Sequence, residues 1–102
     1  MFEGFLSPKP GRRRSRLREL MESGYASVVY ESPFRIVKLL ADVAEIDGER
    51  EIVVGRELTK LHEEIASGTA KDLHGDFAGR DKVLGEFSVY IAGKKRSISD
   101  DD

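Results

Sequence analysis

The chain contains no cysteine and no tryptophan, and only three prolines and two histidines among its 102 residues. Without cysteine, neither disulfide bonds nor thiolate chemistry is available, and a reducing compartment is the natural expectation. No apolar run approaches the roughly 18 residues that span a bilayer, and the N-terminus lacks the apolar stretch of a signal peptide. We therefore expect a cytoplasmic protein without a membrane segment.

Several common catalytic and binding motifs are also missing. His62 and His74 have no companion ligands at metal-binding spacing, so no metal site is expected. The chain has neither a glycine-rich loop that would cradle phosphates nor a G-x-S-x-G turn, and its aromatic residues do not form the paired motif of an RRM sheet. What remains is a chain with 39% hydrophobic and 35% charged residues, which is typical of one globular domain with a polar surface.

Charge is unevenly distributed along the chain, although the formal net charge is only −2. The N-terminal part holds a basic cluster, formed by Lys9, Arg12, Arg13, Arg14, Arg16 and Arg18. This cluster predicts either a contact with a polyanion such as RNA or simply the solvated face of a first helix. The chain ends in three aspartates, and we expect residues 94–102 to form a disordered acidic tail.

Apolar patterns and turn residues predict alternating strands and helices, which is the pattern of an α/β fold. We expect residues 1–11 to be an extended interdomain segment that leads into a domain at 12–93. Expected strands cover residues 26–30, 51–55 and 86–92, and expected helices cover 13–22, 32–45 and 69–77. The apolar run at 26–30 favours a strand covered on both faces. Ser32 and Pro33 suit a helix start, whereas 56–68 fits either a helical turn or a strand.

Three polar blocks adjoin the expected strands, where ligands gather in open α/β sheets. They are 30–35 (YESPFR), 56–60 (RELTK) and 85–87 (GEF). In the first block, Glu31 and exposed backbone groups can hold an adenosine, or Glu31 can pair with Arg35 at a plain strand-to-helix turn. In the second, Arg56 can pair with Glu57 or Glu31, either in a site or in a network that stiffens the sheet edge. Gly85 permits the close approach of a ligand, or is an ordinary turn glycine.

Together with a fourth block at 2–9 (FEGFLSPK), these blocks have an order and spacing that resemble the C-terminal half of tetrapyrrole-methylase-type methyltransferases. Within that family they are most similar to the branch called ribosomal RNA small-subunit methyltransferase I. The likeness extends from Phe2 to about Gly93. It implies the fold of the C-terminal domain of that family, a mixed β-sheet flanked by helices, with a strand-like segment near 63–67.

The resemblance also implies a cofactor and the residues that bind it. Enzymes of this class hold S-adenosylmethionine in a cleft between two α/β domains and are usually homodimers. Carried over to this chain, the cofactor-binding residues are Tyr30, Glu31, Ser32, Arg56, Glu57, Leu58, Gly85, Glu86 and Phe87. The candidates for RNA contact are Lys9, Arg12, Arg35 and Lys60. No residue stands out as the general base that would deprotonate a ribose hydroxyl.

The same resemblance implies that the chain is one part of a larger enzyme. The N-terminal domain of the family is absent, so we expect a half-complete cofactor cleft and no activity from the chain alone. The expected partners are that domain, small-subunit ribosomal RNA and a second copy, and the expected reaction is 2′-O-methylation of a cytidine. The alternatives are a domain that methylates a corrin or porphyrin, or a stand-alone RNA-binding or dimerisation module.

Overall fold

A computed structural model of the protein describes residues 1–59 and 62–95, with only the backbone described at positions 58, 59 and 62. These residues form strands and helices in alternation along most of the chain. In order they are β1 (Phe2–Phe5), α1 (Pro10–Glu22), β2 (Ser27–Glu31), α2 (Ile36–Asp47), β3 (Glu51–Thr59), β4 (His62–Thr69), α3 (Ala70–Ala78) and β5 (Glu86–Ile91).

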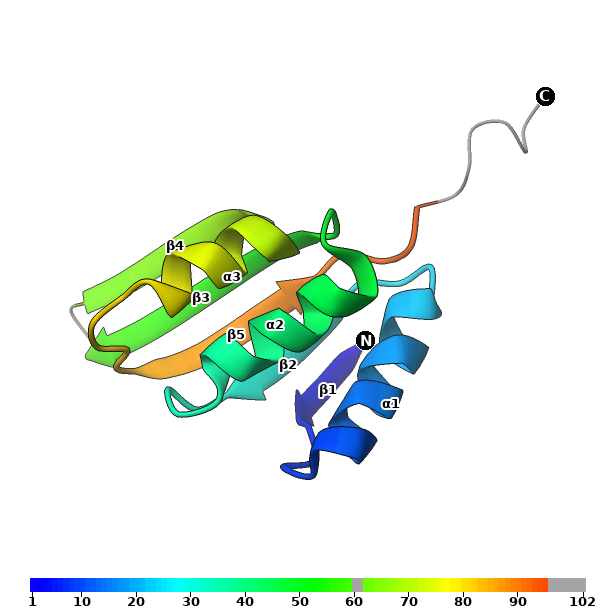
Figure 1. The fold of residues 1–102 in the computed structure, drawn as a ribbon, viewed down its shortest axis with the longest axis horizontal. Helices are drawn as coiled ribbons and strands as arrows, with labels where there is room; N and C mark the ends of the chain where they lie inside the picture. The colour runs from blue at the N-terminus through cyan, green and yellow to red at the C-terminus, as the bar shows by residue number, and fades with distance from the viewer. Residues whose placement is uncertain (60–61, 96–102) are drawn as a thin grey trace.

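The strands form one five-stranded sheet in the order β1-β2-β5-β3-β4. β1 runs parallel to β2, and the other neighbouring strands are antiparallel. The three helices lie on the same side of the sheet, with α1 beside β1 and α3 over β3 and β4 (Figure 1). This arrangement confirms the predicted class, an α/β fold with a mixed sheet flanked by helices.

The core lies between this helical layer and the sheet. Along β5, Phe87, Val89 and Ile91 are buried whereas Ser88 and Tyr90 are exposed, because successive side chains of a strand point to opposite faces. The helices contribute a matching stripe at helical spacing, formed by Leu17, Leu20, Met21, Ile36, Leu39, Leu40, Val43, Ala70, Leu73 and Phe77. Full burial of one such large side chain contributes about 1.5–3 kcal/mol.

The other face of the sheet is not covered by any described element, and this corrects the expectation for β2. Ser27, Val29 and Glu31 are buried under the helices, but Tyr30 on the opposite face is exposed. The apolar run in the sequence predicts two covered faces, whereas residues 1–59 and 62–95 supply helices for only one. We call the uncovered side the open face.

Two helix starts differ from the sequence-based prediction. α1 begins at Pro10 and not at residue 13, because proline at the first position needs no hydrogen-bond acceptor for an N–H group. α2 begins at Ile36, after a turn in which the N–H groups of Arg35 and Ile36 both donate to the carbonyl of Ser32. Ser32 therefore does not cap the helix with its side chain, as predicted, but ends the strand before the turn.

The ambiguous segment after residue 55 is a β-hairpin. β3 continues to Thr59, beyond the expected end, and pairs with β4 from Glu51 opposite Thr69 to Thr59 opposite His62. The strand-like segment implied near 63–67 is confirmed, and the helical alternative is wrong. Thr69 then caps α3, because its side-chain oxygen accepts a hydrogen bond from the N–H of Asp72 at 3.3 Å.

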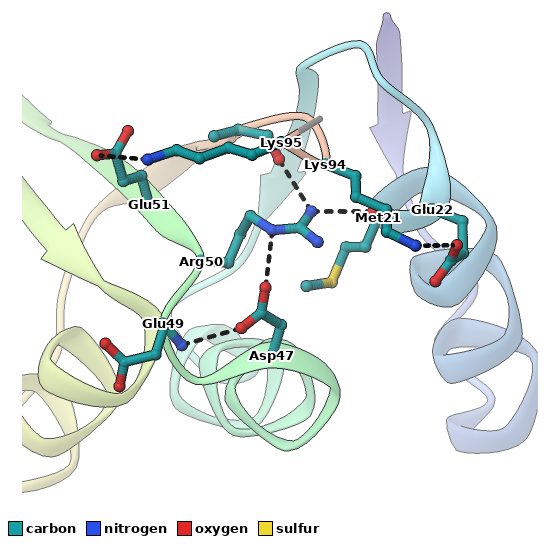
Figure 2. A network of polar contacts seen from close by, with 9 residues as sticks. Met21, Glu22, Asp47, Glu49, Arg50, Glu51, Lys94 and Lys95 are labelled. Atoms are coloured by element: carbon teal, nitrogen blue, oxygen red, sulfur yellow. Dashed lines mark hydrogen bonds and ion pairs between the residues drawn. The ribbon is translucent and has the colours of Figure 1, made fainter. Parts of the chain in front are cut away.

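A polar network ties together the sheet end at which β3 begins and β5 ends (Figure 2). Arg50 donates to the carbonyls of Met21 and Ala92, both at 3.0 Å, and to the carboxylate of Asp47 at 3.1 Å. One side chain thus joins the ends of α1, α2 and β5. Close by, Lys94 pairs with Glu22 at 3.0 Å and its N–H donates to the carbonyl of Ser23.

These contacts bear on the predicted boundaries of the domain. Lys94, which the sequence predicts in the acidic tail, is held against α1. Residues 96–102 lie outside the described part, so their disorder stays a prediction. Phe2–Phe5, assigned to the interdomain segment, form an edge strand of the sheet. No helix in residues 1–59 and 62–95 combines the length and apolarity that crossing a membrane requires.

Candidate functional site

Three polar blocks predicted from the sequence meet at the sheet end opposite to Arg50. In the sheet register, Phe87 of β5 lies between Glu31 of β2 and Arg56 of β3. Glu86 lies beside Glu57 in the same way. β5 runs antiparallel to both neighbours, so its beginning coincides with their carboxyl ends. The convergence expected from the sequence is therefore present in the fold.

A groove of about 560 Å³ lies on the open face where these strands meet. Only small residues form its floor, because Ser88 of β5 lies beside Gly55 of β3 in the register. Tyr30 flanks Ser88 on one side and Ile65 flanks Gly55 on the other. Large side chains on the outer strands and small ones in the middle thus create a depression across the sheet. The lining comprises Phe5, Tyr30, Gly55, Arg56, Glu57, Glu63, Glu64, Ile65, Glu86, Phe87 and Ser88.

One side of the groove is acidic. Glu57 lies directly opposite Glu86 on β5 and opposite Glu63 on β4, and all three side chains are exposed. Like charges directly opposite one another on neighbouring strands are destabilising. A row of three carboxylates across three strands therefore costs folding stability and favours a ligand that carries positive charge or hydrogen-bond donors.

An ion-pair network supports the groove from the helical side. Arg56 lies 3.0 Å from the carboxylate of Glu64, and Arg80 binds the same carboxylate through two nitrogens at 3.0 Å each. The Arg80 guanidinium also lies 3.9 Å from the ring centre of Phe77. Hydrogen bonds from Arg80, with the nearby charge of Arg56, lower the pKa of Glu64 below its ordinary value of 4.5. The prediction that Arg56 pairs with Glu57 or Glu31 is wrong, because β4 places Glu64 beside Arg56.

Glu31 belongs to the buried side of the sheet end. Its carboxylate accepts a hydrogen bond from the N–H of Ser32 at 2.9 Å and from the Arg35 side chain at 3.4 Å. This is the ion pair that the plain-turn interpretation anticipated. The Ser32 hydroxyl is buried without a hydrogen-bond partner among the described residues. Neither Glu31 nor Ser32, both predicted to bind the cofactor, lines the groove.

The remaining predicted residues are placed in different ways. Gly85 has a φ of +103°, in the region that favours glycine, and leads into Glu86. Leu58 lies in β3, where only its backbone is described, and Lys60 lies outside the described residues. Lys9 and Arg12 are exposed at the start of α1, on the helical side. Arg35 is exposed just before α2, where it pairs with Glu31, and it does not line the groove.

Six lining residues carry no role in the sequence-based assignment, namely Phe5, Gly55, Glu63, Glu64, Ile65 and Ser88. The alternation of β5 predicts that Ser88 faces away from Phe87, but not which residues lie beside it. Gly55 is the last residue of an expected strand, where a glycine is typical of a turn. The pairing of β3 with both β4 and β5 defines the groove, and pairing register between distant strands is not visible in a single sequence.

The chain closely matches several curated proteins named ribosomal RNA small subunit methyltransferase I. It is 40% identical over 95 residues to the protein of Thermotoga maritima, 36% over 101 residues to that of Bacillus subtilis, and 43% over 93 residues to that of Mycobacterium tuberculosis. The chain is homologous to part of ribosomal RNA small subunit methyltransferase I. These matches include 90–99% of the chain.

The chain spans only 42% of the Thermotoga relative and 32–34% of the other two. Among solved structures, the crystal structure of the methyltransferase CobJ matches with a TM-score of 0.64 at 16% identity, over 95% of this chain and 43% of CobJ. Identity at that level shows the fold alone. A comparison with models of known protein families found no match.

Proposed function

We propose that the chain is the C-terminal part of an S-adenosylmethionine-dependent methyltransferase of small-subunit ribosomal RNA and forms one wall of its cofactor cleft. The observation that carries this proposal is the convergence of Tyr30, Arg56 and Glu86, one residue from each polar block, at a single groove. The homologues named above direct the proposal to ribosomal RNA. The likeness to CobJ supports the fold and does not argue for a corrin substrate.

The groove fits the chemistry of the cofactor. Its volume of about 560 Å³ lies within the 300–1,000 Å³ of ordinary small-molecule pockets. The Tyr30 ring offers a flat wall for an adenine, and the carboxylates of Glu57 and Glu86 accept hydrogen bonds from ribose hydroxyls. The negative charge of these carboxylates also attracts the positively charged sulfonium centre of S-adenosylmethionine. When bound, S-adenosylmethionine supplies the electrophilic methyl group, and this chain's residues bind and orient it.

The acceptor in this proposal is the 2′-hydroxyl of a cytidine in small-subunit ribosomal RNA. The proton acceptor for that hydroxyl and the second wall of the cleft belong to the part of the relatives that this chain does not span. The chain alone is then inactive in methyl transfer, although it binds the cofactor weakly. The whole enzyme works in the cytoplasm, as a homo-oligomer, with ribosomal RNA as its substrate.

The proposal is tested by titrating the isotope-labelled chain with S-adenosylmethionine and following backbone amide signals by NMR. We expect saturable shifts confined to the groove, with a dissociation constant on the order of 1 mM because only one wall is present. Gly55→Leu should abolish these shifts. A side-chain carbon at Gly55 would meet only the carbonyl oxygen of Ser88, at an ordinary 3.8 Å, so the backbone accepts the substitution while the groove fills.

Ser67→Leu is the matched control. Ser67 is exposed on the open face of β4, opposite Val53, and does not line the groove. This variant should bind as the parent does. The proposal is wrong if no groove amide shifts at millimolar cofactor, if the shifts map to the helical side, or if Gly55→Leu and Ser67→Leu bind equally well.

A further inference from the structure

Three aromatic rings are clustered on the open face next to the groove. Phe2 and Phe5 of β1 pack edge-on against Tyr30 of β2, with ring centres 5.3 and 5.6 Å from the Tyr30 ring. Phe2 remains 68% exposed and Phe5 64%. Phenylalanines are usually buried, so two exposed side by side indicate a surface that meets a partner. We call Phe2, Phe5 and Tyr30 the aromatic platform.

An irregularity in β1 builds this platform. In a regular strand, Phe2 and Phe5 would point to opposite faces, because they are three residues apart. The pairing of β1 with β2 instead shifts register between Phe2 and Gly4, and Gly4 has a φ of +75°. A bulge with a glycine in this conformation re-aims the side chains that follow it. As a result, both rings reach Tyr30 on the same face.

Basic side chains lie at the same edge of the sheet. Arg16 of α1 binds the carboxylate of Glu3 on β1 through two nitrogens at 2.8 Å each. The flank of α1 that carries Arg16 therefore faces β1, and Arg12, one helical turn earlier, shares this flank. Lys9 comes just before α1, whose first turn lies beside the end of β1 (Figure 1). Lys9 and Arg12 are exposed and form no ion pair within the described part of the chain.

Charge of opposite sign therefore flanks the aromatic platform on its two sides. At the groove on the open face, Glu57, Glu63 and Glu86 repel phosphates. Beyond the β1 edge, at the start of α1 on the helical side, Lys9 and Arg12 attract them. Flat aromatic rings bordered by cations are the combination that binds single-stranded nucleic acids, because bases stack on the rings while phosphates contact the cations. A double helix cannot use the rings, since its bases are already stacked.

We infer that the aromatic platform binds unpaired nucleotides of RNA, with bases stacked on Phe2 and Phe5 beside Tyr30 and the backbone held by Lys9 and Arg12. This inference rests on the proposed function and adds to it a surface for the substrate. Because Phe5 and Tyr30 also line the groove, a nucleotide stacked there lies next to the proposed cofactor site. The platform would therefore select an unpaired nucleotide and position it for methyl transfer.

The test uses the full chain and a fluorescently labelled oligocytidylate RNA of about eight nucleotides, with an RNA duplex of the same length for comparison. Binding is measured by fluorescence anisotropy over a series of salt concentrations. We expect the single strand to bind more tightly than the duplex. Phe2→Leu should weaken binding about tenfold without changing the salt dependence. Phe2→Tyr, which keeps a ring, should bind like the parent.

Two further variants separate stacking from charge. Arg12→Gln should reduce the slope of log K against log salt by about 0.7, the value for one phosphate contact on a single strand. Phe34→Leu removes a phenylalanine that is 94% exposed but outside the platform, and it should change nothing. Circular dichroism of each variant checks that the fold is kept.

Three results would overturn the inference. One is equal binding of single strand and duplex, and another is unchanged affinity in Phe2→Leu. The third is sedimentation of the parent as a dimer that Phe2→Leu dissociates, which would assign the platform to a second copy. Failure of the proposed function is recognised separately, because Phe2 does not line the groove. If the cofactor causes no amide shifts while RNA still binds to the platform, the proposed cofactor site is wrong. If the cofactor binds in the groove while Phe2→Leu leaves RNA binding unchanged, the inference about the platform is wrong.

Discussion

Substitution of Arg13 or Asp42 should destabilise the protein strongly, although neither residue belongs to the groove. The Arg13 side chain donates to the Asp42 carboxylate at 3.0 Å, and the two side chains are 3% and 1% exposed. Arg13 is therefore not available to a polyanion, although the sequence places it in the basic cluster. Removal of one partner from a buried ion pair costs about 3–5 kcal/mol, because the other charge stays buried without compensation.

The two single variants should differ. In Arg13→Met, the Lys38 ammonium, 3.9 Å from the other Asp42 oxygen, still compensates part of the carboxylate charge. We expect a loss near 3 kcal/mol for this variant and near 5 kcal/mol for Asp42→Leu, which leaves the Arg13 guanidinium buried alone. Total stabilities of 5–15 kcal/mol are usual, so both losses are a large share of the total and both variants should unfold at much lower urea concentrations.

The double variant Arg13→Met/Asp42→Leu should recover most of the loss, since well-packed apolar replacements of a buried ion pair are often neutral or stabilising. The parent, the two single variants and the double variant form a double-mutant cycle. Their free energies of unfolding are measured by urea denaturation at neutral pH, with far-UV circular dichroism as the signal. Single losses below about 1 kcal/mol, or a double variant whose loss equals the sum of the two single losses, would refute this reasoning.

Two further predictions concern the Arg50 end of the sheet and the network behind the groove. Gly93→Ala should destabilise by about 1–3 kcal/mol in urea denaturation, because the added carbon would overlap the backbone of Gly24. Its control Gly75→Ala, in open space on α3, should be neutral or stabilising. Arg80→Gln should return the pKa of Glu64 toward 4.5 in a carboxyl NMR titration. Because the folded pKa of Glu64 is lowered, its stabilisation is present above about pH 4.5 and lost as pH falls through the folded value. The free energy of unfolding of Arg80→Gln should therefore fall less than that of the parent as the pH is lowered below about 4.5. An unchanged pKa of Glu64 in this variant would contradict the role of Arg80 in lowering it.

Much of the fold is predictable from local patterns. The alternation in β5 and the helical stripe of Leu39, Leu40 and Val43 follow from two simple periods, and both are observed. Helix starts are less predictable, because Ser32 and Pro33 satisfy the local rules for a cap while the chain forms a turn and begins α2 at Ile36.

The site is predictable in outline and not in detail. The sequence blocks indicate which strand ends carry polar residues, but the partner of Arg56 depends on a hairpin register that placed Glu64 beside it. The aromatic platform depends on a bulge at Gly4, which reads in the sequence as an ordinary turn residue. Covered and open faces also look alike in sequence, because an apolar residue such as Tyr30 can face a helix, a ligand or another domain.

We propose that the groove at the meeting of β2, β5 and β3 holds the adenosine of the cofactor. Intermolecular nuclear Overhauser effects between the labelled chain and S-adenosylhomocysteine test it most directly. We expect contacts from the adenine and ribose protons to Tyr30, Gly55 and Ser88. Contacts to the helical layer instead, or none at a cofactor concentration that saturates the amide shifts, would contradict it.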